Sequence, residues 1–217
     1  MSSLPVELTK LRRMLLSMGA EVEQRVNEAL DSLLRHDLRL AEKVRRGDDV
    51  IDKMDVDVEA ECVEILALHQ PVARDLRYVL AALRINADLE RIADLARGIA
   101  KRAIKLEHEK QIDRPPALVQ MAGAVRSMVA DALKALADQD EPLARSIRRR
   151  DLIVDDHYKQ LMSWSVDTVA AQGEDAKAII DTLSIVRAME RMADLTTNIA
   201  EATIFSIAGE VVRHTPV

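Results

Sequence analysis

An internal repeat limits this chain to a fold that is built twice. The segment Glu-Arg-Ile-Ala-Asp-Leu at residues 90–95 returns as Glu-Arg-Met-Ala-Asp-Leu at residues 190–195. Earlier in the chain the offset is 103 residues, which aligns Val26 with Val129 and Asp52 with Asp155. Chance similarity between helical sequences explains this ordered match poorly, so we expect two units of one fold.

Both units are expected to be helical. Gly and Pro occur only six times each in 217 residues, too few for the turns of a β-rich chain. Prolines and Gly173 separate predicted helices at residues 6–36, 38–69, 72–108, 117–138, 142–171 and 175–210. Asp37 is the expected N-cap of the second helix, and Asp140 or Glu141 helps to start the fifth. The prediction is an all-α fold of two tandem, pseudo-symmetric three-helix bundles, residues 1–110 and 117–217, with a linker at about 111–116.

The predicted core is aliphatic, because hydrophobic residues make up 48% of the chain and aromatic residues only 2%. Two stripes with helical spacing mark it. They consist of Val44, Ile51, Met54, Val58, Cys62 and Ile65 in the second helix, and Ile85, Leu89, Ile92, Ala96, Ile99 and Ala103 in the third.

Composition also narrows the possible partners and location. A net charge of −6 argues against nucleic acid as a partner, since phosphate binding requires a basic face. Cys62 is the only cysteine, which excludes an intrachain disulfide and fits a reducing compartment. The N-terminus lacks the apolar region of a signal peptide, and no stretch reaches the roughly 20 apolar residues of a spanning helix. We therefore expect a cytoplasmic protein that meets membranes only through partners.

Acidic residues recur at a spacing of four, which places each pair on one face of a helix. In an antiparallel hairpin around Pro71, residues equidistant from the turn lie at one height, which pairs Asp52 with Glu90. A turn between Gln172 and Gly173 does the same for the second unit. The two predicted sets are Asp48, Asp52, Glu90 and Asp94, and Asp151, Asp155, Glu190 and Asp194. Glu28 and Asp131, on the first helix of each unit, are expected within about a turn of them.

Oxygen-rich clusters of this kind bind hard or borderline cations, so we predict metal sites for iron, manganese, magnesium, zinc or calcium. The alternative is ion pairing with nearby arginines at 91, 97, 187 and 191, or simply solvated helix faces. The five histidines lie near helix ends or in a tail, and none has Glu three residues before it, so the Glu-x-x-His signature of di-iron bundles is missing. His157 could touch the second set, but a surface position is favoured. Cys62 is interpreted as a core residue.

These features resemble the PhoU family of phosphate-signalling proteins. The resemblance lies in the two Glu-Arg-Ile/Met-Ala-Asp motifs, in His-Gln-Pro-Val-Ala-Arg-Asp-Leu-Arg at residues 69–77, and in Asn-Ile-Ala-Glu at residues 198–201. It covers nearly the whole chain. Many members have His after the motif Asp, whereas Leu95 and Leu195 stand there in this sequence, so the resemblance implies no histidine ligand at these positions.

The resemblance implies a regulator and not an enzyme. It implies an adaptor between the ATPase subunit of a phosphate ABC transporter and a sensor histidine kinase, acting as a negative regulator of phosphate uptake and of the phosphate-starvation response. It also implies a homodimer. Two other interpretations stay open: a metal-dependent enzyme that uses the carboxylate clusters, and a purely structural helical scaffold.

Overall fold

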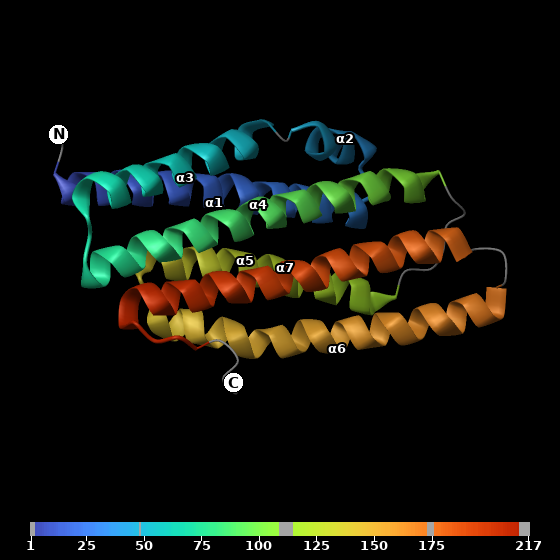
Figure 1. Ribbon diagram of the computed structural model, residues 1–217. Coiled ribbons are helices and arrows are strands. Elements are labelled where there is room, and N and C mark those ends of the chain that lie inside the picture. The colour runs from blue at the N-terminus through green and yellow to red at the C-terminus, as the bar shows by residue number, and fades with distance from the viewer. Residues whose placement is uncertain (1–2, 48, 109–114, 173–175, 213–217) are drawn as a thin grey trace.

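The computed structural model describes residues 3–47, 49–108, 115–172 and 176–212, and within them it contains seven helices and no strand (Figure 1). The first unit comprises α1 (Leu4–Leu34), α2 (Leu38–Arg46), α3 (Asp49–His69) and α4 (Ala73–Glu107). The second comprises α5 (Pro116–Asp138), α6 (Glu141–Gln172) and α7 (Ala176–Ala208). The predicted all-α fold is therefore confirmed. None of these helices is long and apolar enough to cross a membrane.

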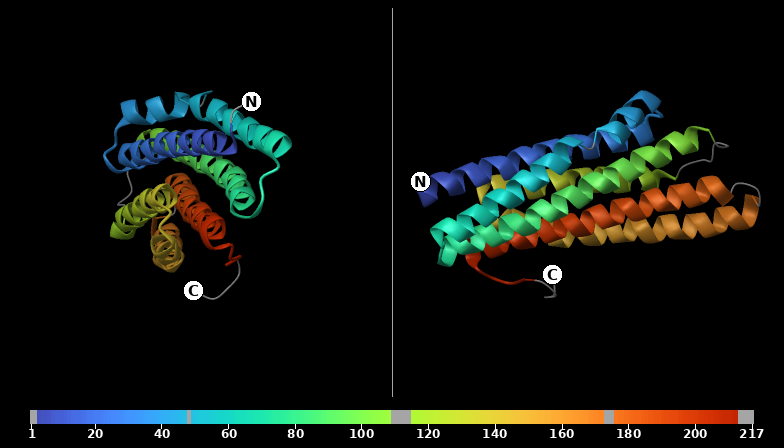
Figure 2. Two further views of the ribbon diagram at one scale, coloured as in Figure 1. Left: turned by 90° about the vertical axis from the view of Figure 1, so that its left-hand side faces the viewer. Right: turned by 45° about the horizontal axis from the view of Figure 1, so that its top comes forward.

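The long last helices of the two units form the middle of the molecule. The α4 and α7 helices lie side by side and share the most extensive contact between any two elements (Figures 1 and 2). The α3 and α6 helices lie at opposite outer edges, and α1 also packs against α5. Gly19 on α1 permits part of that approach, because a Cβ there would lie 2.6 Å from Cδ2 of Leu133 on α5. The two units thus share an interface along their length.

The prediction of one helix over residues 38–69 is wrong, because the chain ends α2 at Arg46 and starts α3 at Asp49. Gly47 is the C-cap of α2, with φ −92° and ψ 43°, outside the helical range. Glycine in a helix interior costs about 0.5–1 kcal/mol relative to alanine. Charge favours the break too: basic side chains lie in the last turn of α2 and acidic ones in the first turn of α3, each matching its helix dipole.

Capping at two other helix starts agrees with the sequence. The Asp37 carboxylate accepts hydrogen bonds from the backbone N–H groups of Arg39 and Leu40, both at 3.0 Å. Asp140 accepts one from the N–H of Leu143 at 2.9 Å, at the start of α6. Each cap satisfies donors that have no partner within the helix itself.

Both predicted apolar stripes lie in the core. The whole stripe of α4 is buried, as are Val44 of α2 and four residues of α3, while Met54 is partly buried. The repeated motifs contain residues of the buried stripe on α4 and of its counterpart on α7. Burial of these residues therefore sets the direction in which the motif carboxylates face. The predicted linker residues 111–114 lie outside the described residues.

Candidate functional site: two acidic clusters beside a basic groove

The predicted acidic set of the second unit does come together between α6 and α7. Burial is the main cause that raises the pKa of Asp151 to about 6, and the negative charges of Asp194, Asp155 and Glu190 raise it further. All four residues of the set therefore interact electrostatically. We call them the second acidic cluster.

The two members of this cluster on α7 also have raised pKa values. Burial raises the pKa of Glu190, followed by the charges of Asp194 and Asp155, while Arg191 and Arg187 oppose the shift. Burial and then the charge of Asp155 also raise the pKa of Asp194. Carboxylates held this close, with their hydration reduced, favour a proton or another cation among them.

The first unit repeats most of this arrangement between α3 and α4. Burial raises the pKa of Glu90, and the charges of Asp94, Asp55 and Asp52 add to the effect, with Arg91 opposing it. Three of the four predicted residues are therefore brought together. Asp48, the fourth, lies outside the described residues.

Asp55 belongs to the first acidic cluster, although the sequence analysis missed it. Its side chain accepts a hydrogen bond from Nδ2 of Asn86 at 2.7 Å, and its backbone carbonyl accepts another from the same group at 3.0 Å. Burial raises the pKa of Asp55, as do the charges of Glu59 and Asp52. The hairpin rule that pairs Asp52 with Glu90 places Asp55 level with Ala87, one residue from Asn86, so this signal was available. We define the first acidic cluster as Asp52, Asp55, Glu90 and Asp94.

The two clusters differ in their surrounding cations. Arg97 lies 2.6 Å from an Asp94 oxygen. Burial lowers the pKa of Arg25, and the negative charge of Asp52 partly offsets that shift. At the matching positions the second unit has Thr197 and Met128, which are neutral. The second unit instead has Arg187 near Glu190, at the repeat position that Ala87 occupies in the first unit. Ion pairing, the alternative to metal binding, therefore accounts for part of the first cluster.

Glu28 and Asp131 are engaged elsewhere. Glu28 forms an ion pair with Lys43 on α2, and Asp131 forms one with Arg150 on α6. Their carboxylates are thereby held by cations of their own units. Glu28 and Asp52 nevertheless both act on the charge of Arg25, and Arg150 directly precedes Asp151, which supports the expected approach to the clusters although neither residue joins one.

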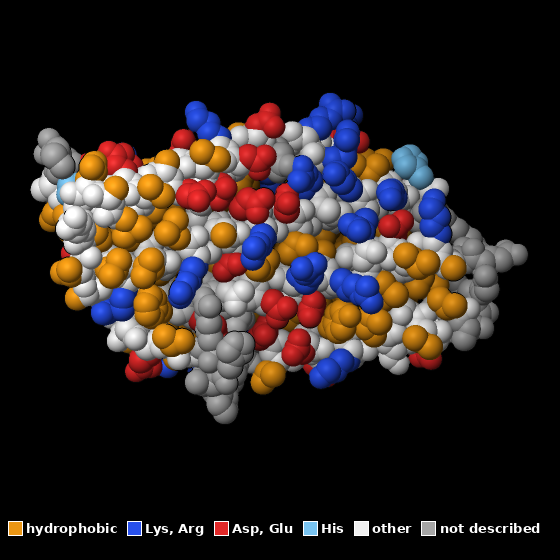
Figure 3. All heavy atoms as spheres, viewed as in Figure 1, with side chains coloured by type: hydrophobic (Ala, Val, Ile, Leu, Met, Phe, Trp, Pro, Cys, Tyr) orange, Lys and Arg blue, Asp and Glu red, His pale blue; other side chains and the backbone are white. Residues whose placement is uncertain are grey.

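A basic groove separates the two clusters. Figure 3 shows one acidic group over α3 and α4, another over α6 and α7, and basic side chains between them. The groove has a volume of about 630 Å³ and lies between α4 and α7. Repeat-related residues line both walls: Arg91 with Arg191, Asp94 with Asp194, and Leu95 with Leu195. Arg102 adds a further positive charge, 4.0 Å from Asp181.

The clusters supply oxygen atoms, the ligand type of hard cations. Across the described ranges, however, no group of three or more His, Cys, Asp or Glu side chains converges closely enough to hold a metal ion together. A cation at either cluster would then be bound through one or two carboxylates and its own water, as Mg²⁺ commonly is. The donor chemistry fits such a hydrated ion better than it fits a fully enclosed one.

Neither Cys62 nor His157 joins a cluster. Cys62 is buried, and burial is the main cause that raises the pKa of its thiol to about 12, so it stays protonated as a core residue. His157 is partly exposed, which is compatible with the favoured surface position, but its Nδ1 is buried and has no hydrogen-bond partner among the described residues. Its place between the buried Val154 and Leu161 on α6 explains this.

Comparison with known proteins finds one family over most of the chain. The PhoU domain matches twice, at residues 15–103 and 118–203. A phosphate-specific transport system accessory protein PhoU homolog of Pseudomonas aeruginosa is 41% identical over 96% of this chain and 86% of its own length. One from Pseudomonas putida is 40% identical, over 96% and 82%.

Solved structures agree with the sequence relatives. The crystal structure of PhoU from Pseudomonas aeruginosa has a TM-score of 0.90 and 36% identity, and covers 96% of this chain and 100% of that one. The phosphate transport system regulatory protein PhoU from Streptococcus pneumoniae also reaches 0.90, with 30% identity, 97% of this chain and 99% of that one covered.

Proposed function

Because the chain belongs to the PhoU domain family, we propose that it is an accessory protein of a phosphate transport system that regulates by binding. The finer role is that of a cytoplasmic adaptor between the ATPase subunit of a phosphate ABC transporter and a sensor histidine kinase. In this role it is a negative regulator of phosphate uptake and represses starvation genes when phosphate is plentiful. The names of its relatives, which are accessory and regulatory proteins of phosphate transport, support the accessory role.

The observation that carries the adaptor proposal is the charge pattern of one face. Two acidic clusters lie on either side of a basic groove, and repeat-related residues build both halves. An alternating pattern of this kind offers complementary charge to a partner and fixes the orientation in which the partner docks. Its duplication gives two similar half-surfaces, which suits a protein that must meet two partners.

Cation binding at the acidic clusters is part of this proposal. The mutual repulsion of Asp151, Asp155, Glu190 and Asp194 supports it, because a divalent ion would relieve that repulsion. We expect the second cluster to bind more tightly than the first, where Arg97 and Arg25 already supply positive charge. A bound ion would change the charge pattern that the partners meet.

Exposed apolar side chains support self-association as a homodimer. Val50 and Val63 on α3 are exposed, and their repeat partners Ile153 and Val166 on α6 are exposed as well. Isolated apolar residues are common on surfaces, but a set repeated on both outer helices suits a self-complementary contact. Sedimentation equilibrium tests this proposal. The double variant Val63→Asp/Val166→Asp is expected to weaken the dimer. A wild-type protein that is monomeric would contradict the proposal.

The adaptor proposal is tested by binding and by gene expression together. The wild-type protein should bind the reconstituted transporter and the kinase, with affinity that falls as salt is added. Arg91→Glu/Arg191→Glu reverses charge on both walls of the groove and should weaken binding at least about tenfold, or by about 1.4 kcal/mol. Arg149→Glu, an exposed change on α6, is the control.

A deletion strain completes the test. Starvation genes should stay on in rich phosphate when the protein is missing, and the wild-type gene should restore repression. Normal repression in the deletion strain, in the absence of a second copy of the gene, would contradict the adaptor role and leave a structural scaffold.

A further inference from the structure

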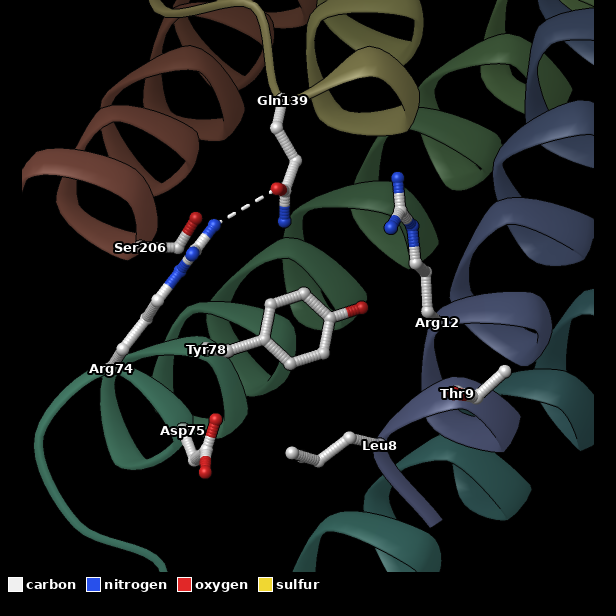
Figure 4. Close-up of a pocket in the computed structure, with 8 residues that line it drawn as sticks. All are labelled: Leu8, Thr9, Arg12, Arg74, Asp75, Tyr78, Gln139 and Ser206. Atoms are coloured by element: carbon white, nitrogen blue, oxygen red, sulfur yellow. Dashed lines mark hydrogen bonds between the residues drawn. The ribbon is translucent and has the colours of Figure 1, made fainter. Parts of the chain in front are cut away.

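A second pocket lies where the two units meet (Figure 4). It is near the start of α4, several helical turns before Glu90 and Asp94. Its volume is about 240 Å³. The first unit contributes side chains from α1 and from the first turns of α4, and the second contributes Gln139, at the turn between α5 and α6, and Ser206 on α7. The volume is below the roughly 300–1,000 Å³ of pockets for drug-sized ligands, so the pocket suits a small ion.

Two guanidinium groups line this pocket without a carboxylate partner among the described residues. Arg12 donates to the backbone carbonyl of Ala137, and Nη2 of Arg74 donates to Oε1 of Gln139 at 3.0 Å. Both acceptors are neutral, so neither positive charge is compensated by these contacts. Each guanidinium has five N–H donors, and most of them remain available.

Tyr78 adds a hydroxyl group that lacks a partner. Its Oη is buried and makes no hydrogen bond within the described structure. Burial raises the pKa of Tyr78 to about 12, so the hydroxyl is protonated and can donate. Figure 4 shows this hydroxyl on the Arg12 side of the ring. Buried polar atoms nearly always have a hydrogen-bond partner, so the simplest explanation for this unpartnered hydroxyl is that it donates to a ligand of the pocket.

One carboxylate limits what the pocket accepts. Asp75 lines it on the side away from Arg12 (Figure 4), so two positive charges face one negative charge. A fully deprotonated anion is repelled by Asp75. An oxyanion that keeps a proton can instead donate that proton in a hydrogen bond to it.

We propose that this pocket binds inorganic phosphate in a protonated form. Arg12, Arg74 and Tyr78 donate to its oxygens, and Asp75 accepts from its P–OH group. Sulfate has the same shape but no proton near neutral pH, and a phosphate monoester is mostly a dianion, so both should bind more weakly. Since residues of both units surround the ion, its binding also stabilises the packing between the units.

Calorimetric titration of the full chain with phosphate and with sulfate tests this inference. Arg12→Gln, Arg74→Gln and Tyr78→Phe should each weaken phosphate binding, the arginine changes by about tenfold or more. Tyr78→Phe keeps the ring and removes only a hydroxyl that has no partner, so it should fold normally. Arg13→Gln, an exposed change beside Arg12 on α1, is the matched control. Circular dichroism checks the fold of every variant.

Asp75→Asn gives a second, opposite readout. It should raise the affinity for sulfate toward that for phosphate, because the repelling charge is gone. Phosphate should also raise the melting temperature of the wild-type protein more than that of Arg74→Gln. The proposal is overturned if phosphate fails to bind at about 10 mM, if sulfate binds as tightly to the wild type, or if the arginine variants keep their affinity. These titrations use neither transporter nor kinase, so their failure would leave the adaptor role intact.

Discussion

Asp151 on α6 and Asp194 on α7 lie close enough for the charge of Asp194 to raise the pKa of Asp151. The two carboxylates repel each other across the contact between α6 and α7, in a region where burial already disfavours both charges. Such pairs are rarely kept for stability, since each ionised group costs free energy there. The relationship makes the second acidic cluster the most informative place to test.

Stability should fall with rising pH because of Asp151. Its pKa is 3.8 in the unfolded chain and about 6 in the folded protein, so the folded state holds the proton more tightly. The favourable contribution is fully present below pH 4 and is lost as pH rises through about 6. We expect Asp151→Asn to stabilise the protein by about 1–2 kcal/mol at pH 8, less than the full shift implies because the side chain is partly exposed.

Urea unfolding at pH 5 and pH 8 measures this effect. Asp167→Asn, an exposed change on the same helix, is the control and should leave the pH dependence of the wild type unchanged. Equal pH dependence of stability in the wild type and in Asp151→Asn would show that folding does not raise the pKa of Asp151.

Divalent cations should bind the second cluster in preference to the first. Glu190→Gln/Asp194→Asn should abolish the tighter site for Mn²⁺ or Mg²⁺, while Glu90→Gln/Asp94→Asn should have a smaller effect. Affinity should rise with pH through about 6, because the ion displaces the proton of Asp151. Calorimetry with each double variant checks this. Equal losses in the two variants would mean that Arg97 and Arg25 do not distinguish the sites.

Loss of the Asp37 cap should weaken α2. Asp37→Ala removes the acceptor of two backbone N–H groups at the start of that helix. The expected loss of unfolding free energy is about 1 kcal/mol. Asp37→Asn should retain most of it, since asparagine is also a good N-cap. A stability equal to wild type for Asp37→Ala would show that α2 contributes little to folding.

The ion pair of Arg148 and Glu201 links α6 to α7 inside the second unit. Nε of Arg148 lies 3.3 Å from Oε1 of Glu201, and each side chain is only 10% exposed. Arg148→Met alone should cost about 3 kcal/mol because it removes the cation that lies beside a buried carboxylate. Arg148→Met/Glu201→Met should recover much of that loss. Chemical denaturation of the single and double variants measures the coupling, and additive losses would contradict a direct pair.

Sequence alone determined the helical fold, its duplication and the buried stripes, because these depend on local periodicity and on where turns occur. Ile85, Leu89 and Ile92 had to face a core wherever α4 lay. The same hairpin geometry placed Asp155 level with Glu190. The family resemblance rested on these same features and is confirmed.

The tertiary structure decided which side chains from distant segments converge. Gly47 divides a helix that periodicity alone continues, and Asp55 joins a cluster through its bond to Asn86. Arg12 and Gln139 line one pocket only because α1 and the α5–α6 turn come together where the two units pack. Height along a hairpin follows from counting residues, but the rotation and tilt of each helix follow from packing over the whole core. Those angles decide which charges are compensated and which are left facing a ligand.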